Sequence, residues 1–161
     1  MSAEPSNREQ VVALLEGGHA HMPFEAAVAD FPMEAINQKP ANVSYSPWAL
    51  LEHMRLTQAD ILEFITAGSD YVEKQWPQDY WPPEHRQATP ELWHETLAGF
   101  RRDHETLLTM AKDPSVPMSQ AFEHALEYNL LRELLTVADH NAYHIGEFAI
   151  LRQVMGIWPD R

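Results

Sequence analysis

The chain of 161 residues is long enough for one domain with a substantial core, and its 45% hydrophobic residues are typical of a folded globular protein. Its 11 basic and 24 acidic side chains give a formal net charge of -13, which disfavours binding to nucleic acid or to an anionic membrane surface. Because the sequence has no cysteine, disulfides, thiolate metal ligands and a cysteine nucleophile are excluded.

Start and stop signals predict two helices in the first half of the chain. The first is expected over about residues 6–16, because Ser6 is a favoured N-cap residue and two glycines follow the segment. Pro23 argues against one continuous helix through the next segment, FEAAV, and the stretch FPMEAINQKPANVSYS is expected to be a connection. The second helix is expected over Pro47–Ala67, since Ser46 and the proline after it form a cap-plus-proline start.

Residues 68–90 contain four prolines and several large aromatic side chains. A connection of this length normally crosses the fold or covers a site, and it would let the second and third helices run parallel. The third helix is expected over Pro90–Lys112, because Thr89 and Pro90 repeat the cap-plus-proline start. The last helix is expected over at least Leu130–Met155, and a start as early as Ser119 stays open.

The pattern favours no strand, so the predicted fold class is all-α, in one domain over residues 1–161. The N-terminus lacks a basic stretch followed by an apolar core, and no run of 18 apolar residues occurs anywhere. We therefore expect a cytoplasmic protein.

Three histidines lie on the apolar faces of the predicted helices. His140 and His144 are four residues apart, and a rotation of about 100° per residue places both among the large apolar residues of the last helix. His53 lies on the corresponding face of the second helix. Because residues i and i+4 are about 6 Å apart at Cβ, and because imidazole is a common metal ligand, these residues are candidate ligands of one metal ion. We expect a helical bundle centred on this ion.

A simpler interpretation of the histidines stays open. Nine histidines in one chain produce pairs with this spacing by chance, so the spacing alone is a weak motif. A single core-facing histidine, such as His53 taken alone, is more often hydrogen-bonded than metal-bound.

Three segments of the chain resemble the DinB-like family of metalloenzymes: SPWALLEHM, YWPP and DHNAYHIGEFAILRQVMGIWP. The family's early Trp-x4-His pattern corresponds to Trp48 and His53, and its late His-x3-His-x-Gly pattern, the more specific of the two, to His140, His144 and Gly146. The resemblance covers essentially the whole chain, in order. It implies a four-helix bundle with up-down-down-up topology, a divalent ion held by the three histidines, and a homodimer.

Three neutral nitrogen ligands would leave a position on the ion for water or substrate, which is the arrangement of catalytic zinc sites. Zinc or nickel is expected first, with iron, cobalt or manganese as alternatives. The resemblance implies a transferase that uses a low-molecular-weight thiol beside its small-molecule substrate. The same ligands would serve a hydrolase that uses metal-bound hydroxide, and a non-enzymatic, dimeric metal-binding module is the third alternative.

Two carboxylates near the predicted ligands are candidates for supporting roles. Glu147 lies one turn beyond His144 on the same face, so we predict that it orients that ring or acts as a general base. Asp60 lies two turns from His53 and has a weaker claim to a similar role.

Further residues are expected to lie around the site. His104, on the apolar face of the third helix, is either a fourth ligand or a core histidine with a hydrogen-bond partner. Arg152 projects about 120° from His140, so we expect it to miss the metal cavity. Three aromatic residues of the crossover either form an apolar lid over a ligand or pack the crossover onto the bundle: Trp76, Tyr80 and Trp81.

Overall fold

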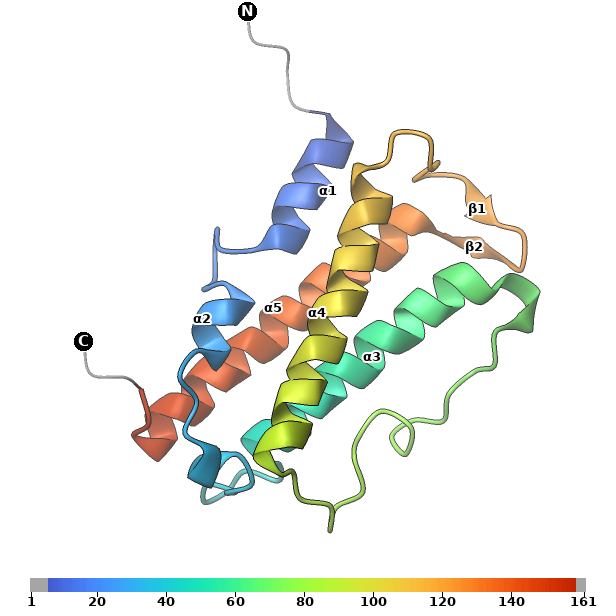
Figure 1. Ribbon diagram of the computed structural model, residues 1–161. Helices are drawn as coiled ribbons and strands as arrows, with labels where there is room; N and C mark the ends of the chain where they lie inside the picture. Colours follow the sequence, from blue (N-terminus) through green and yellow to red (C-terminus); the bar gives the residue numbers. More distant parts are fainter. Residues whose placement is uncertain (1–5, 159–161) are drawn as a thin grey trace, which may run out of the picture.

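The computed structural model describes residues 6–158, which form a mostly helical protein (Figure 1). The α-helices are α1 (Asn7–Glu16), α2 (Phe24–Val28), α3 (Pro47–Ala67), α4 (Pro90–Lys112) and α5 (Leu130–Met155). Two 3-10 turns, Met33–Ala35 and Gly68–Asp70, and an antiparallel hairpin of β1 (Ala121–Phe122) and β2 (Ala125–Asn129) lie between them. The predicted helical character is confirmed, whereas the predicted absence of strands is wrong.

Short polar caps determine where the long helices begin, as the sequence predicted. The side chain of Ser46 accepts a hydrogen bond from the backbone N–H of Ala49 at the start of α3. Thr89 accepts one from the N–H of Leu92 at the start of α4, and a reciprocal capping box at Ser6 opens α1. Each cap satisfies a backbone donor that would otherwise lack a partner and typically contributes about 1 kcal/mol.

The hairpin also corrects the earliest predicted start of α5. Asn129 is extended, with φ -150° and ψ 168°, and its side chain accepts from the N–H of Arg132, so the helix begins at Leu130 rather than near Ser119. The hairpin packs on the end of α3, where the ring of Phe64 lies 5.3 to 5.8 Å, centroid to centroid, from two aromatic rings of the hairpin, Tyr128 and Phe122. This aromatic contact joins distant parts of the chain, so local periodicity does not reveal it.

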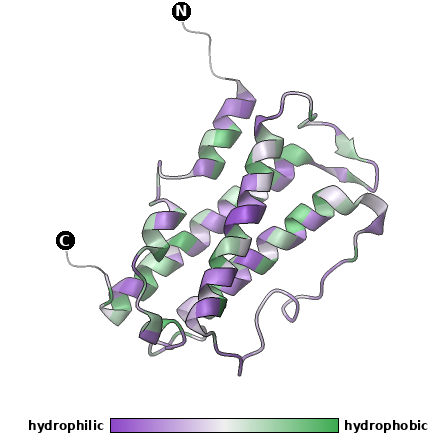
Figure 2. Ribbon diagram, viewed as in Figure 1, coloured by the Kyte–Doolittle hydropathy of each residue, from purple (hydrophilic) through white to green (hydrophobic). Residues whose placement is uncertain are grey.

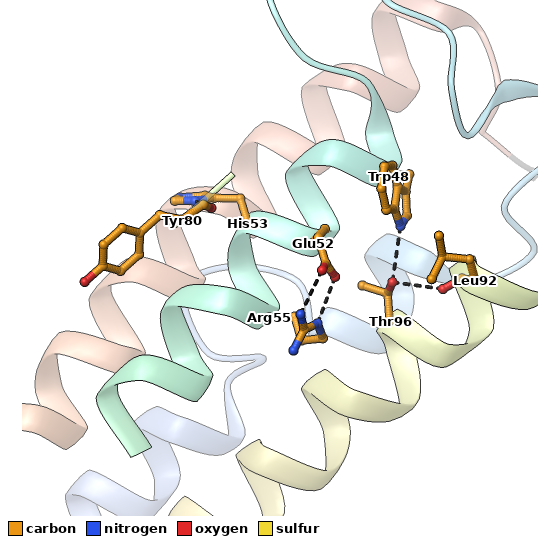
Figure 3. Close-up of polar contacts among 7 residues, drawn as sticks. All are labelled: Trp48, Glu52, His53, Arg55, Tyr80, Leu92 and Thr96. Carbon is orange, nitrogen blue, oxygen red and sulfur yellow. Dashed lines mark hydrogen bonds and ion pairs between the residues drawn. The ribbon is translucent and has the colours of Figure 1, made fainter. Parts of the chain in front are cut away.

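Hydrogen bonds between buried side chains hold α3, α4 and α5 together. The indole N–H of Trp48 donates to Thr96 Oγ1 (Figure 3), and Gln58 donates to the carbonyl of Phe100. Because the earlier residue of α3 pairs with the earlier residue of α4, these two helices run parallel. Gln58 also accepts from the amide of Asn141 on α5. With 1% of its surface exposed, Gln58 depends on these two bonds to offset its burial.

The other long helices run in the opposite direction to α3 and α4. His53 near the start of α3 lies beside His144, and Phe64 near its end lies beside Tyr128 just before α5, so α3 and α5 are antiparallel. The first turn of α1 contacts the end of α4 and its last turn contacts the middle of α4, so these two are also antiparallel. Figure 1 shows the crossover, residues 71–89, returning along α3 to the start of α4.

The buried apolar side chains form two clusters along the bundle. One lies between α2, the first halves of α3 and α4, and the end of α5, and includes Trp48, Trp93 and Phe148. The other lies between α1, the end of α4 and the start of α5, and includes Leu107 and Leu134. Figure 2 shows hydrophobic and hydrophilic positions alternating along these helices, as expected for one buried face. Among the helices described, none is long and apolar enough to cross a membrane.

Candidate metal centre

The three predicted ligands meet at one point between α3 and α5. His53 projects from α3, and His140 and His144 project from consecutive turns of α5. The Nε2 atom of His53 lies 3.1 Å from Nε2 of His144 and 3.2 Å from Nε2 of His140. The potential ligand atoms of the three residues all lie within 4.8 Å of one another. The fold therefore brings ring nitrogens from two distant segments to a common point.

The partners of the outer ring nitrogens show where the protons lie. Nδ1 of His53 donates to the backbone carbonyl of Tyr80 at 2.8 Å, and Nδ1 of His144 donates to Oε2 of Glu147 at 2.6 Å. Figure 3 shows His53 on α3 together with Tyr80. Because a carbonyl and a carboxylate only accept, both Nδ1 atoms carry the hydrogen, and in the neutral rings both Nε2 atoms present bare lone pairs. Two lone pairs facing each other at 3.1 Å repel unless a cation lies between them.

Burial favours the neutral form of these rings. Burial and, to a lesser extent, the neighbouring rings of His144 and His53 lower the pKa of His140 to about 3. Burial also lowers the pKa of His53 below its ordinary value, despite the opposing hydrogen bond to Tyr80. Near neutral pH both rings are thus neutral, and in His53, whose hydrogen is at Nδ1, the inner Nε2 is free to bind a metal ion.

The distances also fit a mononuclear site. With metal–nitrogen bonds of about 2.0–2.1 Å and tetrahedral angles, two ligand nitrogens are about 3.3 Å apart. The 3.1 and 3.2 Å separations at His53 are close to this value. Within residues 6–158, no carboxylate and no fourth histidine joins the cluster. A bound ion would therefore keep room for a ligand from solution.

An aromatic pocket of about 490 Å³ opens onto the three nitrogens. Trp81 stacks on the ring of His53, with 4.1 Å between centroids and 1° between the planes. Trp76, Tyr80 and Tyr143 also line the pocket. The structure thus places all three crossover aromatics of the expected lid in the wall of the pocket that holds the histidines.

Two polar side chains that line this pocket did not emerge as candidates from the sequence. Oγ1 of Thr57 is buried and has no hydrogen-bond partner among the described residues, so it is free to bond to a ligand. Tyr45 lies in the connection before α3, and burial together with the Glu147 carboxylate raises its pKa to about 12. Thr57 is one turn from His53, which is a usable sequence signal, whereas nothing in the sequence around Tyr45 indicates its position.

The two predicted carboxylates have distinct places. Glu147 accepts from His144, as proposed for a residue that orients the ring. Asp60 is not among the potential ligands. It is buried and accepts from the hydroxyl groups of Tyr71 at 3.0 Å and Tyr80 at 2.6 Å. Asp60 therefore holds the crossover segment whose Tyr80 carbonyl fixes the ring of His53.

The remaining predicted residues lie away from the cluster. His104 is a half-buried histidine whose Nε2 bonds to the carbonyl of Leu15 at 3.0 Å, so the fourth-ligand alternative does not hold. Arg152 is fully buried but does not line the metal pocket, as expected. Its guanidinium donates to the carbonyls of Ala27, Ala29 and Ile157, and so ties the end of α5 to the segment around α2.

In comparisons with protein-family models, with curated proteins and with solved structures, no match to this chain was found.

Proposed function

We propose that His53, His140 and His144 bind one divalent transition-metal ion at which a small-molecule reaction takes place. The observation that carries this proposal is the convergence of three Nε2 atoms, two of which have their lone pairs directed at one point by oxygen partners at Nδ1. A structural role for neutral histidines would instead pair each inner nitrogen with a hydrogen-bond donor. Zinc or nickel suits three imidazoles best, with iron, cobalt or manganese as alternatives.

We also propose that the chain is an up-down-down-up four-helix bundle of the DinB-like type. The pairwise directions of α1, α3, α4 and α5 support this topology. The resemblance carried by Trp48 and His53 early, and by His140, His144 and Gly146 late, supports the family assignment.

Within this framework, the reaction we propose is a thiol transfer in which the sulfur of a low-molecular-weight thiol forms a bond to an electrophilic carbon. The thiol proton passes to solvent, and the leaving group on that carbon departs with the electron pair of the bond that breaks. A bound divalent ion would lower the pKa of an incoming thiol and polarise an electrophilic group. The chain's own residues would orient the ligand rings and bind the substrate. Glu147 and the Tyr80 carbonyl hold two of the ligand rings, Thr57 offers its unpaired hydroxyl, and the aromatic walls accept an organic substrate while limiting water.

The proposal is tested with untagged protein loaded with zinc or nickel and assayed with thiol–electrophile pairs and with esters. We expect metal-dependent thiol transfer that is lost in His53→Ala and His144→Ala but retained in His94→Ala, a control at an exposed histidine of α4. Melting curves of each variant establish that it is folded. Hydrolysis of esters in the absence of a thiol would contradict the proposed transferase activity and favour the alternative, a hydrolase. Intact metal binding with neither activity would leave a non-enzymatic module.

A further inference from the structure

A second pocket adjoins the metal pocket. It has a volume of about 320 Å³ and is lined by the connection before α3 and by the end of the crossover. Tyr45 and Trp81 line both pockets, so the two cavities are neighbours that share these two side chains, whose ring centroids are 5.5 Å apart. A molecule that reaches the metal along these rings can therefore extend into the second pocket.

The second pocket is lined by an arginine whose side chain has no hydrogen-bond or ion-pair partner among the described residues. Arg86 lines this pocket, and within residues 6–158 its side chain makes no ion pair and no hydrogen bond. Every other described lysine or arginine bonds to a carboxylate or to backbone carbonyls; these are Arg8, Lys39, Arg55, Lys74, Arg101, Arg102, Lys112, Arg132 and Arg152. Arg86 is exposed, so its guanidinium is open to solvent and to a ligand in the pocket, and no carboxylate of the described residues competes for it in a chain with a net charge of -13.

Local contacts keep Arg86 at the pocket. Its backbone N–H donates to the carbonyl of Pro83, and its guanidinium lies 5.7 Å from the ring centroid of the buried Trp48. Glu84 also lines the pocket, but its side chain is 92% exposed and its pairing is with Lys39 at 3.7 Å. That exposed pair offsets part of the charge of Lys39, whereas Arg86 has no carboxylate partner within residues 6–158 that a ligand would have to displace.

We propose that the second pocket is a subsite for an anionic group of the substrate or cosubstrate, recognised by the guanidinium of Arg86. The ligand is then an elongated molecule with a metal-reactive group at one end and a carboxylate at the other, and its middle part lies against Tyr45 and Trp81. A planar carboxylate matches the two parallel donors of a guanidinium. This inference rests on the proposed metal site and names the class of molecule that the site accepts.

The test uses cobalt-loaded protein and two probe series: ω-mercaptocarboxylates of increasing chain length, and ω-mercaptoalcohols of the same lengths. Thiol binding is followed by the absorption of the cobalt ion. At the length that spans both pockets, we expect the carboxylate probe to bind about tenfold more tightly than the alcohol, as one charge-assisted pair allows. Arg86→Gln should abolish this preference without changing the affinity for the alcohol, and Arg86→Lys should retain part of it.

Arg102→Gln is the matched control, since it removes the same charge from a side chain that is 71% exposed and pairs with Asp103. It should leave the preference unchanged, and melting temperatures should show that all variants are folded. Equal affinity for both probes in the unaltered protein, or a preference that survives Arg86→Gln, would overturn the subsite while leaving the metal site intact. Cobalt that binds but responds to neither probe would overturn the open coordination position and the subsite together. Failure to bind cobalt at all would contradict the proposed function itself.

Discussion

At the scale of single residues, the position of the proton on each imidazole matters more than the spacing of the histidines. His53 gives its Nδ1 hydrogen to a carbonyl and His144 gives its own to a carboxylate. An oxygen acceptor at the outer nitrogen raises the electron density at the inner one, and a carboxylate does so more strongly than a carbonyl. His144 is therefore expected to donate more electron density to a bound ion than His53 does.

Glu147→Gln tests the contribution of that carboxylate. Glutamine keeps an oxygen that can accept from Nδ1 of His144 but loses the charge, so we expect one metal ion per chain at saturation and turnover lowered about tenfold. Elemental analysis and steady-state assays measure the two quantities. Unchanged turnover would remove Glu147 from the mechanism.

Tyr80→Phe tests whether the crossover positions His53. Removing the hydroxyl breaks the bond to Asp60 and loosens the segment whose carbonyl holds the imidazole, so we expect metal affinity to fall about tenfold in competition with a chelator. Tyr71→Phe is the matched control, because it removes the other donor to Asp60 without touching that carbonyl. Both variants should lose similar stability, but the control should keep its metal affinity. Equal losses of affinity would show that the effect is structural only.

At the scale of helices, the boundaries were predictable because their signals are local. A polar cap followed by proline marks the start of α3 at Ser46 and of α4 at Thr89, and no distant residue is needed to read it. Once the boundaries are known, the rotation per residue places His53 and the histidines of α5 on buried faces. The hairpin before α5 escaped prediction because contacts with Phe64, far away in the sequence, help to hold it.

The residues that surround the metal ligands were harder to predict from the sequence than the ligands themselves. The carbonyl of Tyr80 holds His53, but every residue has a carbonyl, so no sequence pattern marks this one. Tyr45 reaches the pocket from a connection that has no periodicity to place it. The position of the Tyr80 carbonyl depends on how the crossover folds, and that fold depends on tertiary contacts such as the hydrogen bonds to Asp60.

The contact between α1 and α4 leads to a prediction about pH. Burial lowers the pKa of His104 below its ordinary value of 6.5, so the folded protein resists the proton that the unfolded chain accepts. Its contribution to stability is therefore present above about pH 6.5 and is lost as the pH falls from there toward the folded pKa. His104→Gln retains a donor for the Leu15 carbonyl but does not titrate.

We expect the free energy of unfolding of the unaltered protein to fall more steeply than that of His104→Gln between about pH 7 and about pH 5. Chemical denaturation at each pH measures the difference. The charged neighbours Glu16, Glu105 and Lys112 are common to both proteins, as are the metal-site histidines, so their titration largely cancels. Parallel pH profiles would contradict the assignment of His104 as a neutral, half-buried residue.

At the scale of the whole molecule, one apolar surface of α5 provides a test of the homodimer that the family resemblance implies. Tyr143, Ile150 and Val154 are 66%, 59% and 61% exposed, and their spacing places them on one side of α5 next to the metal pocket. We expect light scattering to give a dimer for the unaltered protein and a monomer for Ile150→Glu, because a buried unpaired charge opposes association. A monomeric unaltered protein at micromolar concentrations would contradict the prediction.

The arrangement of the helices has one main consequence for function, because antiparallel α3 and α5 bring His53 to the two histidines of α5. X-ray absorption spectroscopy of the zinc-loaded protein tests this convergence most directly. The account predicts three imidazole nitrogens at about 2.0–2.1 Å and at least one further light ligand, with one imidazole fewer in His53→Ala. A spectrum with fewer than three imidazoles in the unaltered protein, or one that His53→Ala leaves unchanged, would contradict it.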